Sequence, residues 1–594
     1  MIKRLLLALA IGISSGVTGI SPNRYAFTAY ASPGDTTRPA VPTSADSARA
    51  LSKLASDLAA IVNLPEELKA GRVGIEVRSL TRNRAIYSLN ADKPLTPAST
   101  TKVVTTFTAL SELGPDYMIR TVVGMTNRPK NGVLVGDLYV KGHGDPFLTI
   151  GDIDALVDQT VASGIVEVNG NIVGDGTWFD AKTERIEYSG DDDVVEDLPP
   201  ITALSVENSA FSVIVSSPRT PGEPLNVQTY PRSSGFLIVN SGVTAAGRTA
   251  PAKKGKKGSG RQSQAITPSP GLLRDDLDPS VPRYGDEPAL AQARPRNGST
   301  APEASNIARP PKPAIPSGPL KVQVSAGRDG DQTITVTGTL AANRTVNYHY
   351  EMENPALVVA GMICDRLRAR GIRISGHAVS GATPAKYKAI AETKRPLVEV
   401  LEKVMKHSNN YLAEYVFKMI GAAAGGREET AKRSVEKIGQ RMSIVGVNFN
   451  RCLINDGSGL SRANCLSAEA LAEILSAAYR DRKLFRSFYE LLSIAGVDGT
   501  LRKRMKGTFA ENNLRGKTGT LRNVAALTAY VTTRDGELMV FGSIMNGGNL
   551  GAYRQVQDRI GARLAAFSYS QATAPVTPPA KTPVKPAVTA KPKR

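Results

Sequence analysis

Ser99-Thr100-Thr101-Lys102 is the stretch that decides the fold and the chemistry of this chain of 594 residues. Positions i and i+3 of a helix share one face, so Lys102 is expected beside the hydroxyl of Ser99. A serine hydroxyl is a weak nucleophile, and a nearby lysine amine becomes its base when burial or a second cation lowers the lysine pKa. The stretch therefore predicts Ser99 as nucleophile and Lys102 as base. Alone it is weak evidence, because this spacing recurs by chance and an N-capping serine is the alternative.

A second string, Ser408-Asn409-Asn410, lies 309 residues after Ser99. Ser408 is the right type of residue to relay a proton to a leaving amine. The amide of Asn410 is able to bind a peptide carbonyl and the lysine base together, whereas the middle residue of such a string usually points away from substrate. An apolar run over 411–424 follows and predicts a helix that begins directly after this string.

A third string, Lys517-Thr518-Gly519, completes the pattern. Lys517 and Thr518 are suited to hold a terminal carboxylate, and Gly519 lets substrate approach a strand edge. Lys517 also supplies the second cation that lowers the pKa of the base. The backbone N–H groups of Ser99 and Thr520 are the candidates for an oxyanion hole. In this order, the three strings are the signature of serine acyl-transferases that act on D-alanyl peptides and penicillin.

Local patterns around the strings predict a sheet next to a helix. A periodic apolar run over 99–113 predicts a helix that begins at the nucleophile. Runs of β-branched and apolar residues, separated by turn residues, predict strands at 73–80, 84–89, 523–533 and 537–545.

Beyond these strings, the chain resembles the D-alanyl-D-alanine carboxypeptidase/endopeptidases, the class C low-molecular-mass penicillin-binding proteins. The resemblance covers most of residues 45–567. It implies an α/β (α+β) fold with a beta-lactamase/transpeptidase-like core, in which helices flank an antiparallel sheet, and with inserted β-rich domains. The strings that carry it are DGSGLSR at 456–462, AGVDGTLR at 495–502, GHGDP at 142–146 and ALSVEN at 203–208.

The resemblance also implies a substrate-binding residue outside the three strings. In this family an acidic residue from an inserted domain reaches the active site and recognises the free amino end of the stem-peptide side chain. Asp192, in the acidic run 191–193, lies at about the place of that residue, with a solvated loop as the alternative. Asp456, Ser458 and Asp498 are interpreted as turn-forming residues.

The number of residues between Ser99 and Ser408 is larger than one transpeptidase core accommodates, so extra domains are expected between them. Segment 245–318 is rich in Pro, Gly, Ser, Ala, Lys and Arg, which predicts a disordered insertion within these domains. The expected organisation is a signal peptide at 1–31, a discontinuous catalytic domain at 45–120 and 385–567, inserted domains at 121–384, and a disordered Pro/Ala/Lys tail at 568–594.

The net charge of +20 says little about a partner, because segments 1–31, 245–318 and 568–594 carry +14 of it. Lys3 and Arg4 precede an apolar run and predict a signal peptide, with an uncleaved anchor as the alternative. The chain is therefore expected to be exported to the periplasm or cell envelope, which argues against nucleic acid as a partner. Its basic segments fit loose association with an anionic envelope surface, or solubilisation without a fixed partner.

The predicted function is that of a serine DD-peptidase on peptidoglycan stem peptides and cross-links, as carboxypeptidase, endopeptidase or both. Beta-lactam antibiotics are expected to acylate Ser99. A beta-lactamase-like hydrolase and a catalytically weak, wall-binding penicillin sensor are the alternatives; the long insertion argues against the first and the intact strings against the second. No cofactor is required, and no metal is expected, because none of the four histidines has metal-ligand spacing with another His, a Cys or a paired acid. No Ser-His-Asp triad is needed when lysine serves as the base. Cys452 and Cys465 flank the 456–462 string, and whether they form a disulfide stays open.

Overall fold

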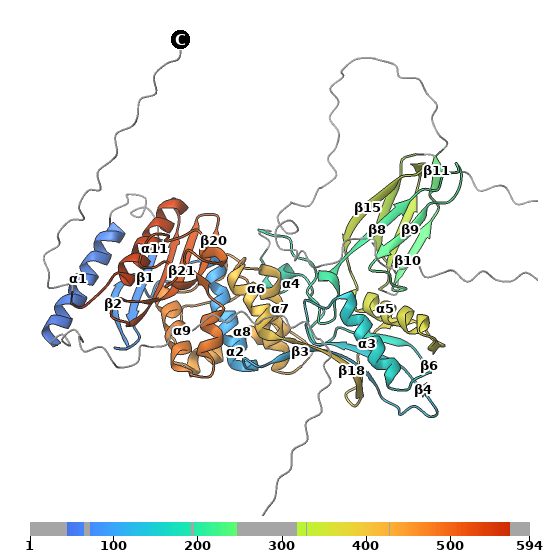
Figure 1. Ribbon diagram of the computed structural model, residues 1–594, viewed down its shortest axis with the longest axis horizontal. Coiled ribbons are helices and arrows are strands. Elements are labelled where there is room, and N and C mark those ends of the chain that lie inside the picture. Colours follow the sequence, from blue (N-terminus) through green and yellow to red (C-terminus); the bar gives the residue numbers. More distant parts are fainter. Residues whose placement is uncertain are drawn as a thin grey trace, which may run out of the picture.

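The computed structural model describes residues 44–63, 72–191, 195–245, 318–327, 330–426 and 428–570. They form an elongated molecule with a six-stranded sheet and its helices at one end and several smaller sheets at the other (Figure 1). The predicted signal peptide lies outside the described residues, as do nearly all of the predicted insertion and tail. Among the described helices, none has the length and apolar character needed to cross a membrane.

The six-stranded sheet is antiparallel throughout and joins the two ends of the described chain, in the order β19-β20-β21-β22-β1-β2. β1 pairs with β22 from Arg72 opposite Asn546 to Ser79 opposite Met539. The expected antiparallel sheet is confirmed, and the four predicted strands end within one residue of the observed ones. The strands are β1 (Arg72–Ser79), β2 (Arg84–Leu89), β19 (Ser493–Ile494), β20 (Arg515–Leu521), β21 (Val524–Thr532) and β22 (Leu538–Asn546).

Helices cover both faces of this sheet (Figure 1). α1 (Ser44–Asn63) and α11 (Leu550–Ala565) pack on one face, where Leu527 of β21 is buried. Its neighbour Ala526 points to the other face, into a core shared with α2, α7 and α9. Since both faces of the sheet are buried under helices, β21 is apolar along most of its length. The helices of this second core are α2 (Thr101–Leu113), α6 (Leu397–Lys406), α7 (Asn410–Ala423), α8 (Thr430–Ile444), α9 (Ala468–Arg480) and α10 (Phe485–Glu490).

A five-stranded mixed sheet lies where the chain leaves this core and returns to it. β3 follows α2 and β18 precedes α6, and the two strands pair antiparallel with Met118 opposite Pro396. The predicted limits 120 and 385 of the inserted region fall within β3 and just before β18. In order, the strands are β17 (Ala378–Ser380), β7 (Ile172–Asp175), β5 (Leu138–Gly142), β3 (Met118–Met125) and β18 (Lys388–Pro396), with α3 (Ile150–Ala162) and α5 (Pro355–Ala369) packed against them.

The remaining strands form small sheets, and α4 (Arg185–Ser189) lies between β7 and β8 in the chain. β11 pairs with β14, and Pro319 bridges to Thr339 of the same strand, so the chain on either side of 246–317 approaches β14. The small sheets are β16 (Arg373–Ile374), β6 (Glu167–Asn169) and β4 (Val133–Val135); β15 (Thr345–Glu351), β8 (Ala210–Ser216) and β9 (Asn226–Tyr230); β10 (Phe236–Asn240), β13 (Gln332–Thr337) and β12 (Lys321–Ala326); and β11 (Val243–Ala245) with β14 (Thr339–Ala341).

The start of the nucleophile helix differs from the prediction. Ser99 lies in a 3-10 turn over Ala98–Thr100, and the α-helix begins at Thr101. The hydroxyls of Thr100 and Thr101 donate to the carbonyls three residues back, at Pro97 and Ala98, and these contacts tighten the turn.

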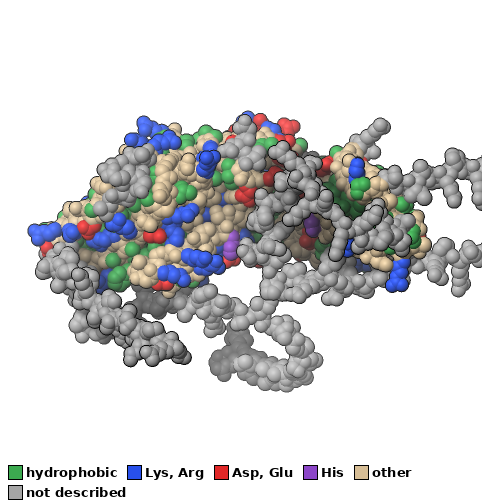
Figure 2. Space-filling model, turned by 90° about the horizontal axis from the view of Figure 1, so that it is seen from above, with side chains coloured by type: hydrophobic (Ala, Val, Ile, Leu, Met, Phe, Trp, Pro, Cys, Tyr) green, Lys and Arg blue, Asp and Glu red, His purple; other side chains and the backbone are tan. Residues whose placement is uncertain are grey.

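The two cysteines in question are free thiols. Cys465 pairs with Leu453 across an isolated bridge, and its thiol donates to the backbone carbonyl of Arg451 at 3.3 Å. On the surface, Figure 2 shows Lys and Arg side chains in several separate groups across the face seen there. This spread is typical of a solvated surface.

Candidate active site

Ser99 and Lys102 lie one turn apart where the 3-10 turn runs into α2. The Nζ of Lys102 is 2.9 Å from the Oγ of Ser99. Lys102 is fully buried, whereas Ser99 is half-buried and so remains reachable from outside. The spacing thus places a buried amine against an accessible hydroxyl.

Lys102 has two further neighbours, and both are acceptors. Its Nζ lies 2.6 Å from Oδ1 of Asn410 and 2.6 Å from the backbone carbonyl oxygen of Ser458. As an ammonium, Lys102 donates to all three oxygens. As a neutral amine it has two hydrogens, which the Asn410 and Ser458 oxygens accept, and its lone pair then faces the hydroxyl of Ser99. These neighbours therefore fix the direction in which Lys102 takes up a proton.

Burial lowers the pKa of Lys102 to about 8, because the charged form loses its hydration. The negative charges of Asp456, Glu414 and Glu196 act in the opposite direction and limit the shift. A lysine with this pKa is partly neutral near pH 7, as a general base must be.

Ser408 and Lys517 form a second pair. Ser408 stands just before α7 in the left-handed region, with φ of 59°. The ammonium of Lys517, on β20, donates to Oγ of Ser408 at 2.9 Å and to the carbonyl of Thr518 at 2.8 Å. Burial, and after it the positive charge of Lys102, hold the pKa of Lys517 well below its usual range. The two lysines are therefore close, as expected, but the effect differs from the prediction: burial lowers the pKa of Lys102, and the second positive charge lowers the pKa of Lys517.

The other two residues of the third string, Thr518 and Gly519, lie on the same strand, β20. Thr518 is buried and its Oγ1 lies 2.7 Å from that of Thr500, while Thr520 is exposed at the strand edge. A Cβ on Gly519 would lie 2.6 Å from the carbonyl oxygen of Pro97. Glycine at this position thus lets β20 pack directly against the turn that carries Ser99, so that the strand edge and the serine share one site.

Two buried carboxylates beside Lys102 complete the electrostatics of the site. Glu414 of α7 accepts the backbone N–H groups of Ser458 at 2.7 Å and Gly457 at 3.1 Å. Burial, and after it the charge of Asp456, raise the pKa of Glu414 to about 7. Sequence reasoning interpreted Asp456 only as a turn former and passed over Glu414. The signal for Glu414 was an acidic residue inside a largely apolar helix, six residues after Ser408.

An acidic residue from the segment between β3 and β18 reaches the site. The carboxylate of Glu196 accepts a hydrogen bond from Nδ2 of Asn410, whose Oδ1 faces Lys102. Glu196 was not expected from the sequence. Asp192 lies outside the described residues, and its neighbour Asp191 accepts the backbone N–H of Arg462 at 3.2 Å. Elsewhere in the described ranges, no group of His, Cys, Asp or Glu is arranged to hold a metal ion.

Comparison with known proteins places this site in a family. The sequence pattern of the D-Ala-D-Ala carboxypeptidase 3 (S13) family matches residues 54–269 and 285–567. The chain belongs to the S13 family. The family prediction made from the sequence is thus confirmed, and with it the prediction of a serine D-Ala-D-Ala peptidase.

Relatives of this S13 protein match it over most of their length. The D-alanyl-D-alanine carboxypeptidase of Actinomadura sp. (strain R39) is 31% identical over 550 residues, which cover 90% of this chain and 88% of that protein. The D-alanyl-D-alanine carboxypeptidase DacB of Haemophilus influenzae is 23% identical over 497 residues, 83% of this chain and 89% of the relative.

A solved structure supports the fold. The crystal structure of penicillin binding protein 4 from Haemophilus influenzae superposes with a TM-score of 0.56 at 21% identity, and covers 86% of this chain and 99% of that one. The predicted fold class, a transpeptidase-like core with an antiparallel sheet between helices and additional β-rich parts, is confirmed by this match.

Proposed function

We propose that this S13 protein is a serine DD-peptidase of peptidoglycan whose acyl-enzyme forms on Ser99. The hydroxyl of Ser99 attacks the carbonyl carbon of a D-Ala-D-X peptide bond, and Lys102 takes up the hydroxyl proton. The bond to the leaving amine then breaks, and the amine leaves with a proton relayed through Ser408. Water hydrolyses the resulting ester, releases the shortened peptide and restores Ser99.

The remaining residues are assigned to substrate. Lys517 and Thr518 bind the terminal carboxylate of the substrate. Hydrogen bonds to this ionised group are stronger than those between neutral groups. The Nδ2 group of Asn410 has two hydrogens, one donated to Glu196 and the other assigned to a peptide carbonyl of the substrate. The backbone N–H groups of Ser99 and Thr520 stabilise the oxyanion.

Asp192 is assigned to the free amino end of the stem-peptide side chain, since the neighbouring Glu196 shows that this part of the chain reaches Asn410. Free D-alanine as the leaving group gives carboxypeptidase activity, and a cross-linking amine gives endopeptidase activity. Beta-lactams acylate the same serine. The signal-peptide pattern in 1–31 supports action outside the cytoplasmic membrane, in the periplasm or cell envelope, where loose contact with an anionic surface fits the basic segments.

One observation carries this proposal: the buried amine of Lys102 lies 2.9 Å from Ser99, with its other hydrogens directed at fixed acceptors. The test is intact-mass spectrometry after incubation with penicillin. The wild-type chain should gain one penicilloyl group on the peptide that contains Ser99, and Ser99→Ala should gain none while it keeps its circular dichroism spectrum. Labelling of the Ser99→Ala variant would place the nucleophile elsewhere. Mass spectrometry of stem peptides and cross-linked dimers then identifies the products.

A further inference from the structure

The carbonyl of Ser458 is one of the two acceptors that direct the lone pair of Lys102, and its own orientation is set by two carboxylates. The N–H of Ser458 donates to Oε1 of Glu414 at 2.7 Å, and the N–H of Gly459 donates to Oδ1 of Asp456 at 2.7 Å. In a trans peptide the C=O and the next N–H point in opposite directions. Asp456 therefore holds one end of this peptide plane, and the other end, the Ser458 oxygen, faces Lys102.

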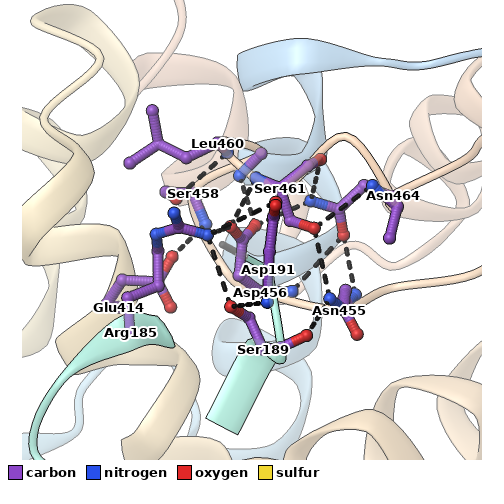
Figure 3. A network of polar contacts seen from close by, with 12 residues as sticks. Arg185, Ser189, Asp191, Glu414, Asn455, Asp456, Ser458, Leu460, Ser461 and Asn464 are labelled. Carbon is purple, nitrogen blue, oxygen red and sulfur yellow. Dashed lines mark hydrogen bonds and ion pairs between the residues drawn. The ribbon is translucent and has the colours of Figure 1, made fainter. Parts of the chain in front are cut away.

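Both carboxylates are held in turn by α4, which belongs to the inserted part of the chain. Figure 3 shows Arg185 directed at Asp456. Nη1 of Arg185 lies 3.3 Å from Oδ2 of Asp456 and 3.8 Å from Oδ2 of Asp191. The hydroxyl of Tyr188 donates to Oε2 of Glu414 at 3.1 Å. Burial, and after it the charge of Glu414, raise the pKa of Tyr188 well above its usual range, so the hydroxyl keeps its proton and stays a donor.

The contact between α4 and this turn is buried. The side chain of Arg185 is 3% exposed and that of Asp456 is fully buried. A carboxylate removed from water is costly unless a cation or several N–H donors compensate it. Asp456 has both kinds of partner, because the N–H of Ser461 and Nδ2 of Asn464 also donate to it, at 2.8 and 2.7 Å. Arg185 thus supplies the balancing charge, while the other donors supply the shape of the turn.

We propose that α4 is a positioning element for the general base: Arg185 and Tyr188 hold Asp456 and Glu414, and these set the Ser458 carbonyl that orients Lys102. This inference rests on the proposed role of Lys102 as base. The inserted region then influences the acylation step through α4, although α4 contacts neither Ser99 nor the amine of Lys102.

Loss of the Arg185 charge has a defined electrostatic effect. The charged groups that act on Lys102 are Asp456, Glu414 and Glu196, which favour its ammonium form, and Lys517, which lies close enough for the two cations to repel. Arg185 partly cancels the field of Asp456. Without it, Asp456 stabilises the ammonium more strongly, so the pKa of Lys102 rises and less neutral amine is present at pH 7.

The test compares Arg185→Gln with the wild type in stopped-flow acylation by a chromogenic beta-lactam between pH 6 and 10. A midpoint raised by one pH unit makes acylation at pH 7 about tenfold slower, and the deficit should shrink toward pH 10. Arg185→Lys, which keeps the charge, should restore most of the rate and the wild-type midpoint. Arg395→Gln on β18 is the matched control, because it breaks another ion pair with a buried carboxylate, Asp145, at 2.8 Å.

A merely structural role for Arg185 predicts a different result. Arg185→Gln and Arg395→Gln would then both lower the melting temperature, and acylation by the folded protein would keep its midpoint; that outcome overturns the inference. If Arg185→Gln does not fold, Tyr188→Phe is measured in its place, since it removes only the hydroxyl. It should slow acylation several-fold, and an unchanged rate overturns the inference.

The same assay separates this inference from the proposed function. If Lys102→Ala acylates as fast as the wild type, Lys102 is not the base and both ideas fail. If Lys102→Ala is inactive while Arg185→Gln and Tyr188→Phe match the wild type, Lys102 remains the base and the proposed role of α4 is wrong.

Discussion

Acylation of Ser99 is expected to follow the protonation of Lys102, because only the neutral amine accepts the serine proton. Burial lowers the pKa of Lys102 from 10.5 to about 8. At pH 7 about one molecule in ten then has the neutral amine, compared with about one in 3,000 for an unperturbed lysine. The buried environment thus raises the reactive fraction roughly 300-fold, which corresponds to about 3 kcal/mol.

The sign of the pH dependence follows from the reactive form. The rate should rise as the pH approaches 8 from below and level off above it. Glu414, with a pKa of about 7, takes up a proton toward the acidic end. Its lost charge lowers the pKa of Lys102, which makes the rate fall less steeply there than the tenfold per pH unit of an isolated base.

The measurement is the second-order rate constant of acylation by a chromogenic beta-lactam from pH 6 to 10, with circular dichroism at each pH to verify folding. Lys102→Arg is the control, because its guanidinium stays protonated across this range, and acylation should be lost at every pH. A rate that is constant from pH 6 to 9, a midpoint near 10.5, or normal acylation by Lys102→Arg would refute the reasoning.

Two more predictions concern substrate and architecture. Thr518→Val removes a hydroxyl from the proposed carboxylate site, where a hydrogen bond to a charged group contributes about 1.5–3 kcal/mol. It should therefore slow acylation by peptides with a free terminal carboxylate more than by amidated ones, and equal losses in stopped-flow assays would contradict a carboxylate site. Replacing residues 247–317 by a short Gly/Ser linker should leave peptidase activity intact, since the chain on both sides approaches β14 and loop length costs only about 0.6 kcal/mol per doubling. Digestion of purified muropeptides measures this, and a folded but inactive variant would show that the segment takes part in function.

The fold and the centre of the site were predictable because their signals are local. Ser99 and Lys102 share a helical turn, so their spacing alone places them together. The strands of the main sheet are apolar runs between turn residues, and their ends were predicted to within one residue. The start of α2 was not, because two threonine hydroxyls convert the first turn to 3-10 geometry through contacts that helix periodicity does not encode.

The residues around this centre were missed because their contacts cross long stretches of sequence. Glu414 meets the Ser458 N–H across 44 residues, Arg185 meets Asp456 across 271, and Glu196 meets Asn410 across 214. A charged residue in a buried position is costly alone and acceptable in a network, and a single sequence does not reveal which partners assemble. Asp456 illustrates this, since its role as a turn former and its ion pair with Arg185 use the same carboxylate.

The contact between α4 and the 456–461 turn bears on how such proteins are built from parts. An insertion joined only by β3 and β18 would be exchangeable, and a chimera that took residues 121–384 from a relative would need two seams. Arg185, Tyr188 and Glu196 add a third seam inside the catalytic region. A workable exchange must therefore carry the 455–464 loop, Asn410 and Glu414 along with the insertion, so the unit that can be exchanged is larger than the insertion and includes part of the active site.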